Sequence, residues 1–365
     1  MKVLGILIAI LAGALCADTP KDTSFQRFGG VPVLAYAEET GWQLGVLGMV
    51  FLKPVGPKDP GGQVDFAVVG TTERQQRVVL NPVLALLGGD ARLDFDVEYR
   101  NWPGKYWSGQ NHPSDSSILY DMKYWQLEGN VVADLDQIHR NLKAGFEFNF
   151  ETNTTRFLSP DSTEYAMHSE DYPDTSELPS KKGGNRIGLG WALQWDSRDH
   201  DNWPRKGLFA WTRQIYYSEW IGSDFNFINT IVDLRAFYPT PLGGAAGLAA
   251  YWEGLLGEAP FDRLAMPDGT YRMRGLSKGR LRDRQQAVLQ MEWRVPMPWR
   301  FSMAAFVEAG KVGGYFSDLL KEETRYAIGA GPRFSLNPKR QVNVRADLAW
   351  VDGGLGMSVY YKEAF

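Results

Sequence analysis

Apolar and polar residues alternate along long stretches of this chain, and several of these stretches are unusually regular. In residues 91–100 the odd positions are apolar and the even positions are charged. Residues 142–151 and 341–350 show a comparable alternation of apolar and polar side chains. A period of two predicts β-strands with one apolar and one polar face. Helical periodicity of similar quality is absent from the sequence, so we predict an all-β protein.

Segments of this kind give sixteen predicted strands. Most of them reach the roughly 9–11 residues that a tilted transmembrane strand requires. They lie near 31–37, 42–53, 63–72, 75–87, 90–101, 118–134, 141–155, 185–196, 207–220, 224–239, 244–258, 286–295, 299–313, 323–336, 342–352 and 354–365.

The connections between these strands differ in length on the two sides of the predicted sheet. The longest connections each follow an odd-numbered strand: 102–117, 156–184, 259–285 and, shorter, 314–322. Two connections on the other side, 54–62 and 197–206, are longer than usual and count slightly against this asymmetry. Long loops on one side and short turns on the other are typical of outer-membrane barrels. A secreted β-sandwich or soluble barrel is the alternative, but its strands would usually be shorter. We therefore predict a 16-stranded transmembrane antiparallel β-barrel.

The beginning of the chain resembles a secretory signal. Lys2 precedes an apolar run over 3–15, and small residues then favour cleavage after Ala17. We predict a signal peptide at 1–17, a short periplasmic segment at 18–30 and the barrel at 31–365. The formal net charge of −4 is too mild for a typical nucleic-acid-binding domain.

A basic segment, residues 271–284, carries six Lys or Arg against one acid, Asp283. Within it, 275–279 matches the G-x-S-x-G pattern of hydrolases. That pattern needs a strand–turn–helix context, which the sequence does not provide. The four histidines also lack metal-ligand spacing. We therefore expect no enzyme activity, no catalytic residue, no metal and no cofactor; a lipolytic enzyme is the weakest of three functional hypotheses.

Several short motifs follow one another in order along the chain. They are Pro32–Gly41, Trp195–Asp199 with Pro204–Gly207, Met273–Leu276, Met291–Trp293, Phe306–Gly310, and Gly329–Arg333 with Val344–Asp347. Together they resemble the outer-membrane protein assembly factor superfamily, the BamA/TamA or bacterial surface antigen type. The resemblance implies a bacterial outer-membrane barrel that inserts or translocates proteins or lipids. Its implied partners are outer-membrane lipid and lipopolysaccharide, and unfolded protein or lipid clients, with no nucleic acid; it indicates no particular oligomeric state.

The sequence departs from the family pattern in three places. Leu276 replaces an aromatic residue, and Glu308 stands where the family has Asp. The segment before residue 31 is too short for the family's periplasmic polypeptide-transport domains, so we expect a stand-alone barrel. A passive or plugged pore with a structural role is therefore the alternative to an assembly function.

The positions of two acids predict where the basic segment lies. Alternation along 286–295 and 299–313 places Glu292 and Glu308 on the polar, inward faces of their strands. We predict that the segment folds into the lumen, where Arg274 pairs with both acids and Gly275 permits close packing. The alternative is an external loop whose arginines contact lipopolysaccharide.

Two further sets of residues are candidates. Asp196, Arg198, Asp199 and Gly207 match the family's turn motif, with Arg198 as a local partner of the acids. The seam between the first and last strands is predicted to be weak. Its markers are Pro32, which cannot donate to a strand ladder, Gly354 at the start of the last strand, and a terminal Phe365 on that strand. Lateral opening at the seam and a stably closed barrel remain equal alternatives.

Overall fold

The computed structural model describes residues 28–37, 41–54, 61–108, 111–113, 117–157, 182–337 and 341–365. The predicted signal peptide and most of the predicted periplasmic segment lie outside the described residues. The strands are β1 (Phe28–Ala37), β2 (Gly41–Phe51), β3 (Gln63–Thr71), β4 (Gln76–Leu86), β5 (Ala91–Tyr106), β6 (Ile118–Asp134), β7 (Leu142–Phe157), β8 (Gly183–Asp196), β9 (Gly207–Tyr217), β10 (Phe227–Pro239), β11 (Ala245–Gly257), β12 (Gln285–Pro296), β13 (Phe301–Gly313), β14 (Arg325–Asn337), β15 (Val342–Val351) and β16 (Gly354–Tyr361).

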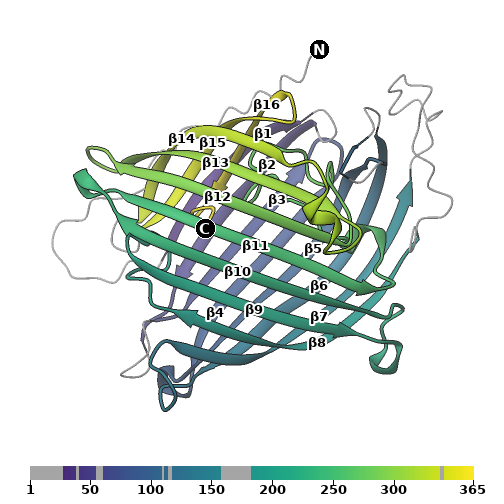
Figure 1. The fold of residues 1–365 in the computed structure, drawn as a ribbon, viewed down its shortest axis with the longest axis horizontal. Helices are drawn as coiled ribbons and strands as arrows, with labels where there is room; N and C mark the ends of the chain where they lie inside the picture. Colours follow the sequence, from purple (N-terminus) through teal and green to yellow (C-terminus); the bar gives the residue numbers. More distant parts are fainter. Residues whose placement is uncertain are drawn as a thin grey trace.

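These strands form one 16-stranded sheet in which each strand pairs with its neighbours in sequence. The pairs are antiparallel throughout the described ladders, and Figure 1 shows the sheet curling around an interior. The predicted all-β antiparallel architecture is therefore confirmed. The only regular helices in the described ranges are five 3-10 turns: η1 (Leu87–Gly89), η2 (Glu219–Ile221), η3 (Pro241–Gly243), η4 (Phe261–Arg263) and η5 (Asp318–Leu320). No described helix is long and apolar enough to cross a membrane.

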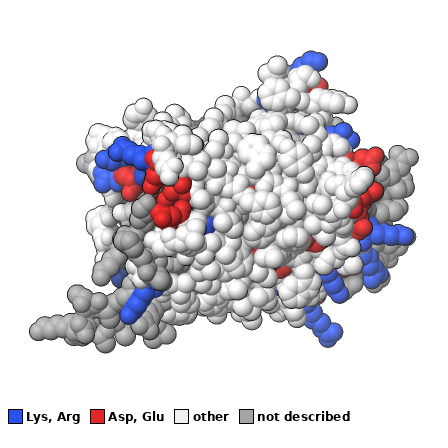
Figure 2. Space-filling model, turned by 90° about the horizontal axis from the view of Figure 1, so that it is seen from below, with Lys and Arg blue, Asp and Glu red and all other residues white. Residues whose placement is uncertain are grey.

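The alternation of residue types places apolar side chains on the outer face of the sheet. On β12, for example, Leu289, Met291 and Trp293 are more than half exposed, while the intervening Gln290 and Glu292 are buried. In Figure 2, charged side chains gather toward the two ends of the molecule, with a mostly uncharged belt between them. An outward apolar belt and an inward polar face are typical of strands that contact lipid.

The two edges of the sheet approach each other without a strand ladder between them. Within the described residues, no backbone pairing joins β1 to β16. Side chains nevertheless connect the two ends of the sheet. Met49 and Phe51 of β2 pack in one cluster with Val342 of β15, and Lys362 pairs with Asp65 of β3 at 3.0 Å. These side-chain contacts span the seam.

The last strand is shorter than the sequence predicts. We predicted it to run to residue 365, with Phe365 on an amphipathic strand, but β16 ends at Tyr361. Lys362 then adopts a left-handed backbone conformation, with φ of +64°, and Phe365 is buried in the interior. The prediction for Phe365 as a seam residue is wrong, because its ring packs against β10 and β11. At the other edge, β1 begins at Phe28, earlier than predicted.

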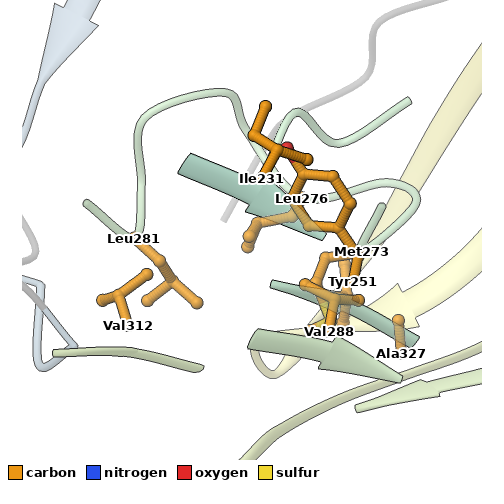
Figure 3. Close-up of a cluster of buried hydrophobic side chains, with 9 residues drawn as sticks. Ile231, Tyr251, Met273, Leu276, Leu281, Val288, Val312 and Ala327 are labelled. Atoms are coloured by element: carbon orange, nitrogen blue, oxygen red, sulfur yellow. The ribbon is translucent and has the colours of Figure 1, made fainter. Parts of the chain in front are cut away.

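The interior is occupied by residues 258–284, which connect β11 to β12 and which we call the inward loop. Its Met273, Leu276 and Leu281 are buried in one hydrophobic cluster with side chains from the surrounding strands (Figure 3). Those strand residues include Tyr251 of β11 and Val288 of β12. Leu276, which replaces the family aromatic, therefore packs inside the sheet and is only 6% exposed.

Candidate functional site

The tip of the inward loop is a tight turn that a single aspartate organises. Asp268 Oδ1 accepts hydrogen bonds from the backbone N–H groups of Thr270, at 2.7 Å, and of Tyr271 and Arg272. The backbone N–H of Gly275 then donates to the carbonyl of Gly269 at 2.9 Å. Gly275 has a φ of +84°, a conformation that glycine adopts without steric cost. This turn fixes the direction in which Arg274 leaves the loop.

Arg274 is the residue at which the inward loop meets the strands. Its Nε donates to Glu308 Oε1 at 2.6 Å, and its backbone N–H donates to Glu308 Oε2 at 2.7 Å. Its Nη1 donates to Glu292 and lies 3.4 Å from Asp347 Oδ2. The side chains of all four residues are fully buried. The structure thus brings together Arg274, Glu292 and Glu308, and it places them in the interior of the sheet.

Two neighbouring side chains fix this arrangement. Phe306 of β13 lies under the guanidinium, with Cζ of Arg274 3.4 Å from the ring centroid. Gln290 of β12 donates to Glu308 Oε1 at 2.8 Å and to the carbonyl of Tyr271 at 2.6 Å. A planar guanidinium can use both its edges and its face in this way, which a lysine ammonium cannot reproduce.

The pairing extends well beyond Arg274. Arg294 Nε donates to Glu292 at 2.6 Å. Arg333 Nη1 donates to Asp347 at 2.6 Å, and its Nε lies 3.2 Å from Glu363. Arg345 pairs with Asp347 and donates from Nη2 to the carbonyl of Thr270 at 2.6 Å. In the described part of the chain, this Arg274 cluster contains four arginines and four acids: Arg274, Arg294, Arg333, Arg345, Glu292, Glu308, Asp347 and Glu363.

The Arg274 cluster is balanced in formal charge, and its members are buried. Taking charges out of water is costly, and mutual attraction offsets the cost only with good geometry and further hydrogen bonds. Such a cluster adds little net stability but penalises the loss of any single partner. It therefore specifies one position for the inward loop.

The inward loop also touches the last strand through its backbone. A Cβ atom on Gly356 of β16 would lie 2.0 Å from the Gly275 carbonyl oxygen. Only two glycines allow the chains to come this close. Arg280 of the same loop pairs with Asp352, in the β15–β16 turn, at 2.9 Å. The loop is thus attached to the final hairpin at two points.

The first half of the inward loop is anchored on the opposite wall. Arg186 of β8 is fully buried and pairs with Asp262 of the loop at 2.7 Å and with Glu151 of β7. Phe261 packs edge-on against Tyr106 of β5 and Tyr120 of β6, with ring centroids 6.0 and 5.4 Å away. The loop therefore crosses the interior and is held at both sides.

The predicted turn motif builds the connection between β8 and β9. Arg198 Nη2 and Nε form a two-point contact with Asp196, at 2.8 and 2.9 Å. Asp199 Oδ1 accepts from the backbone N–H groups of Arg205 and Lys206, at 2.9 and 3.2 Å. Gly207 has a φ of +110°, and a Cβ there would lie 2.3 Å from the Ser197 carbonyl. The contacts of these residues therefore stabilise the β8–β9 turn locally.

The turn also perturbs one ionisable group outside the strands. Burial opposes the charged form of Asp199, but the two backbone N–H donors from Arg205 and Lys206 outweigh it. They hold the pKa of Asp199 below its ordinary value.

The remaining seam residues lie at the two edges of the sheet. Pro32 is exposed in β1 and pairs in register with Val46 of β2. Gly354 is exposed at the start of β16, opposite Val351. Phe365 lies away from both edges, as described above.

Sequence reasoning missed five of the eight members of the Arg274 cluster, and it missed both supporting side chains, Gln290 and Phe306. Arg345 and Asp347 stand on the polar face of the regular alternation in 342–351, so the same parity argument would have placed them inward. Phe306 lies two positions before Glu308 and so shares its face. No pattern in the sequence indicates Glu363, because it lies beyond the last strand.

The described residues contain no group of three or more His, Cys, Asp or Glu side chains suited to hold a metal ion. Ser277, in the G-x-S-x-G match, is exposed in the inward loop. His200 Nδ1 accepts a backbone hydrogen bond from Asn202 at 3.1 Å, and the His139 ring lies against Trp195 in a tilted arrangement, with 4.2 Å between ring centroids. His168 lies outside the described residues.

Two cavities lie beside the loop tip. One, of about 270 Å³, is lined by residues of β5 to β10, including Asp233, and by Arg272. The other, of about 310 Å³, lies between the β8–β9 turn, Tyr271 and residues 362–365. Arg272 and Arg235 contribute to both. These two arginines therefore border both cavities.

Comparison with known proteins identifies the family. Residues 69–351 match the model of the Omp85 superfamily domain. Among solved structures, BamA from Haemophilus ducreyi lacking POTRA domains 1–3 is similar with a TM-score of 0.57 and 12% identity, over 92% of this chain and 68% of that one. CdiB from Acinetobacter baumannii is similar with a TM-score of 0.56 and 12% identity, over 92% of this chain and 59% of that one. A search of curated proteins finds no match. The family model covers most of the chain, and the chain therefore belongs to the Omp85 superfamily of the bacterial outer membrane.

Proposed function

We propose that this protein is a transmembrane barrel that inserts or translocates polypeptides at the outer membrane by opening at the seam between β1 and β16. The observation that carries the proposal is the absence of a backbone ladder between these two strands in the described residues. An incoming strand needs unpaired N–H and C=O groups to begin pairing, and a sheet edge offers them. Every other neighbouring pair in the sheet is already hydrogen-bonded.

The contacts across the seam described above are weak enough to break when the seam opens. The Lys362–Asp65 pair is partly solvated, with Lys362 31% exposed, and a pair of this type contributes about 1 kcal/mol or less. The packing of Met49 and Phe51 with Val342 adds an apolar contact at the same place. The Arg274 cluster, by contrast, joins the inward loop to β12, β13, β14, β15 and Glu363, and need not break when the seam opens.

Proteoliposomes provide the test. A urea-unfolded barrel client is diluted onto vesicles with and without the protein, and its folding is followed by heat-modifiable gel mobility. We expect the protein to accelerate client folding. Failure to accelerate any client, while the protein itself is folded, would overturn the proposed function.

A cross-link tests the seam separately. In a Cys16→Ser background, Asp65→Cys and Lys362→Cys are joined by a short bifunctional maleimide, since these side chains meet. The matched control joins Leu234→Cys to Ala250→Cys, which are direct partners on β10 and β11. We expect the seam cross-link to abolish acceleration and the control to retain it. Equal activity of the two would show that insertion proceeds without seam opening.

A second function, a plugged barrel with a structural role, is favoured by one observation. The inward loop is anchored at both walls and fills the interior with paired charges. Vesicles that contain the protein but show no client folding would support this role, and ion flux without client folding would support a passive pore. We assign no catalytic step in either case. Release of fatty acids that Ser277→Ala abolishes would contradict that assignment.

A further inference from the structure

Residues 362–365, which we call the tail segment, leave the sheet and enter the interior. The backbone N–H of Lys362 donates to the carbonyl of Asn343 at 2.7 Å. Glu363 accepts from Asn343 Nδ2 at 2.9 Å and faces Arg333 Nε at 3.2 Å. These polar contacts tether the first half of the tail segment beside β14 and β15. Ala364 and Phe365 extend beyond them to β10 and β11.

Phe365 is buried there against side chains of β10 and β11. Its ring packs against Phe237 of β10, with 6.1 Å between ring centroids, and Ala249 of β11 completes the cluster. Gly247 of β11 leaves room for the ring, because a Cβ atom there would lie 2.8 Å from a ring carbon of Phe365. The wall therefore lacks a side chain where the aromatic ring lies.

The same pocket recognises the backbone. Arg294 Nη2 donates to the backbone oxygen of Phe365 at 2.7 Å, and its guanidinium also lies 5.5 Å from the Phe365 ring centroid. Arg294 is itself fully buried and is oriented by Glu292 at 2.6 Å. One pre-positioned cation thus contacts both the ring and the backbone of the segment that fills the pocket.

The pocket continues into open space. The cavity of about 310 Å³ borders the tail segment along Lys362 to Phe365 and is otherwise lined by polar and aromatic side chains such as Asn202, Arg235 and Tyr271. A chain longer than the tail segment would therefore find room beside the pocket.

We propose that Phe237, Gly247, Ala249 and Arg294 form a binding site for an extended polypeptide segment that carries an aromatic residue, and that Ala364 and Phe365 occupy this site in cis. The assignment of a client chain as the ligand rests on the proposed function. Binding of an aromatic peptide at this site is tested separately. When the tail segment withdraws, an aromatic residue of a client chain takes the place of Phe365, with its backbone carbonyl on Arg294.

The tail segment and a free peptide compete for the same site, and the tail segment has the advantage that it is covalently attached. A segment joined to its site by a few residues has an effective concentration in the millimolar range. A free peptide therefore competes poorly with the tail segment but binds once Ala364 and Phe365 are gone. Gly247→Val closes the pocket to the peptide without removing any member of the Arg274 cluster.

The experiment uses the peptide Lys-Glu-Ala-X, in which X is a photo-reactive benzoylphenylalanine, with the purified protein in detergent micelles. Four proteins are compared: the full chain, a variant lacking residues 364 and 365, Phe365→Ala, and the shortened variant with Gly247→Val. Heat-modifiable mobility selects folded protein in each case. Cross-linked residues are identified by mass spectrometry, and a peptide with Ala in place of X and a free photo-reactive amino acid serve as controls.

We expect labelling of β10 and β11 to rise about tenfold in the shortened variant over the full chain, with an intermediate rise for Phe365→Ala, because the tether no longer outcompetes the peptide. Gly247→Val should return labelling to the level of the full chain. Equal labelling of the full and shortened folded proteins, or labelling that Gly247→Val leaves unchanged, would overturn the proposed site. Peptide binding without accelerated client folding would support the site and contradict the insertion function. Accelerated client folding without peptide binding would support the insertion function and contradict the site.

Discussion

Gly275 of the inward loop and Gly356 of β16 lie backbone against backbone, so that a Cβ on Gly356 would stand 2.0 Å from the Gly275 carbonyl oxygen. This contact joins the loop that fills the interior to the strand at one edge of the sheet. The position of the loop and the position of the edge strand are therefore coupled.

Gly356→Ala is expected to separate the loop from β16. The added methyl group overpacks a backbone contact that cannot relax by rotating a side chain, so the free energy of unfolding should fall by about 1–3 kcal/mol. Urea unfolding in lipid vesicles, followed by tryptophan fluorescence, measures the change. Gly354→Ala is the matched control on the same strand, since its nearest neighbour is 4.0 Å away. Equal stabilities for the two variants would exclude the coupling.

Arg274→Ala should destabilise the protein by about 3–5 kcal/mol, because Glu292 and Glu308 then lose a buried partner. Arg274→Lys should recover only part of this loss, because an ammonium cannot bond both acids and stack on Phe306. The same urea titration measures both. Arg284→Ala removes an exposed cation of the same loop and should change stability by less than about 0.5 kcal/mol. A full recovery with lysine would show that charge alone matters at this position.

Arg280 and Asp352 should be energetically coupled. Asp352 has a φ of +50°, a region that asparagine also tolerates, so Asp352→Asn removes the charge without straining the backbone. In a double-mutant cycle with Arg280→Gln, we expect a coupling of about 0.5–1 kcal/mol for this partly buried pair. A coupling near zero would mean that the loop is not held at the β15–β16 turn by this contact.

The turn between β8 and β9 should lose stability in acid. Because the pKa of Asp199 is lower in the folded state than in the unfolded state, its carboxylate stabilises the fold above the unfolded pKa of about 4. That contribution disappears as the pH falls through the folded pKa. Asp199→Asn keeps an acceptor oxygen but cannot titrate. The stability difference between wild type and this variant should be below about 1 kcal/mol at neutral pH and should vanish near about pH 2; a pH-independent difference would contradict the assignment.

The sequence predicts the strands well because the period of two is strong where one face meets apolar surroundings and the other is polar. The same parity places Glu292 and Glu308 on the inner face, and from there the pairing with Arg274 follows. Glu363 and Phe365 could not be placed in this way. The alternation near the end of the chain is compatible with a longer strand, and only the pocket made by Phe237, Gly247 and Ala249 draws the tail segment inward.

The pairing between β1 and β16 could not be predicted from a single sequence for a similar reason. Pro32 indicates an edge strand, but whether β1 and β16 pair depends on how the whole sheet curls. That curvature is a sum over fifteen strand pairings and is not encoded at any one residue.

The Arg274 cluster takes its members from β12, β13, β14, β15, the inward loop and Glu363, the second residue after β16. During folding, a sheet that lacked its last hairpin would hold Arg333 without Asp347 or Glu363, and Arg274 with only two of its three acids. The charges balance only when the final strand is in place. Full pairing of the interior charges therefore depends on residues at the far end of the chain.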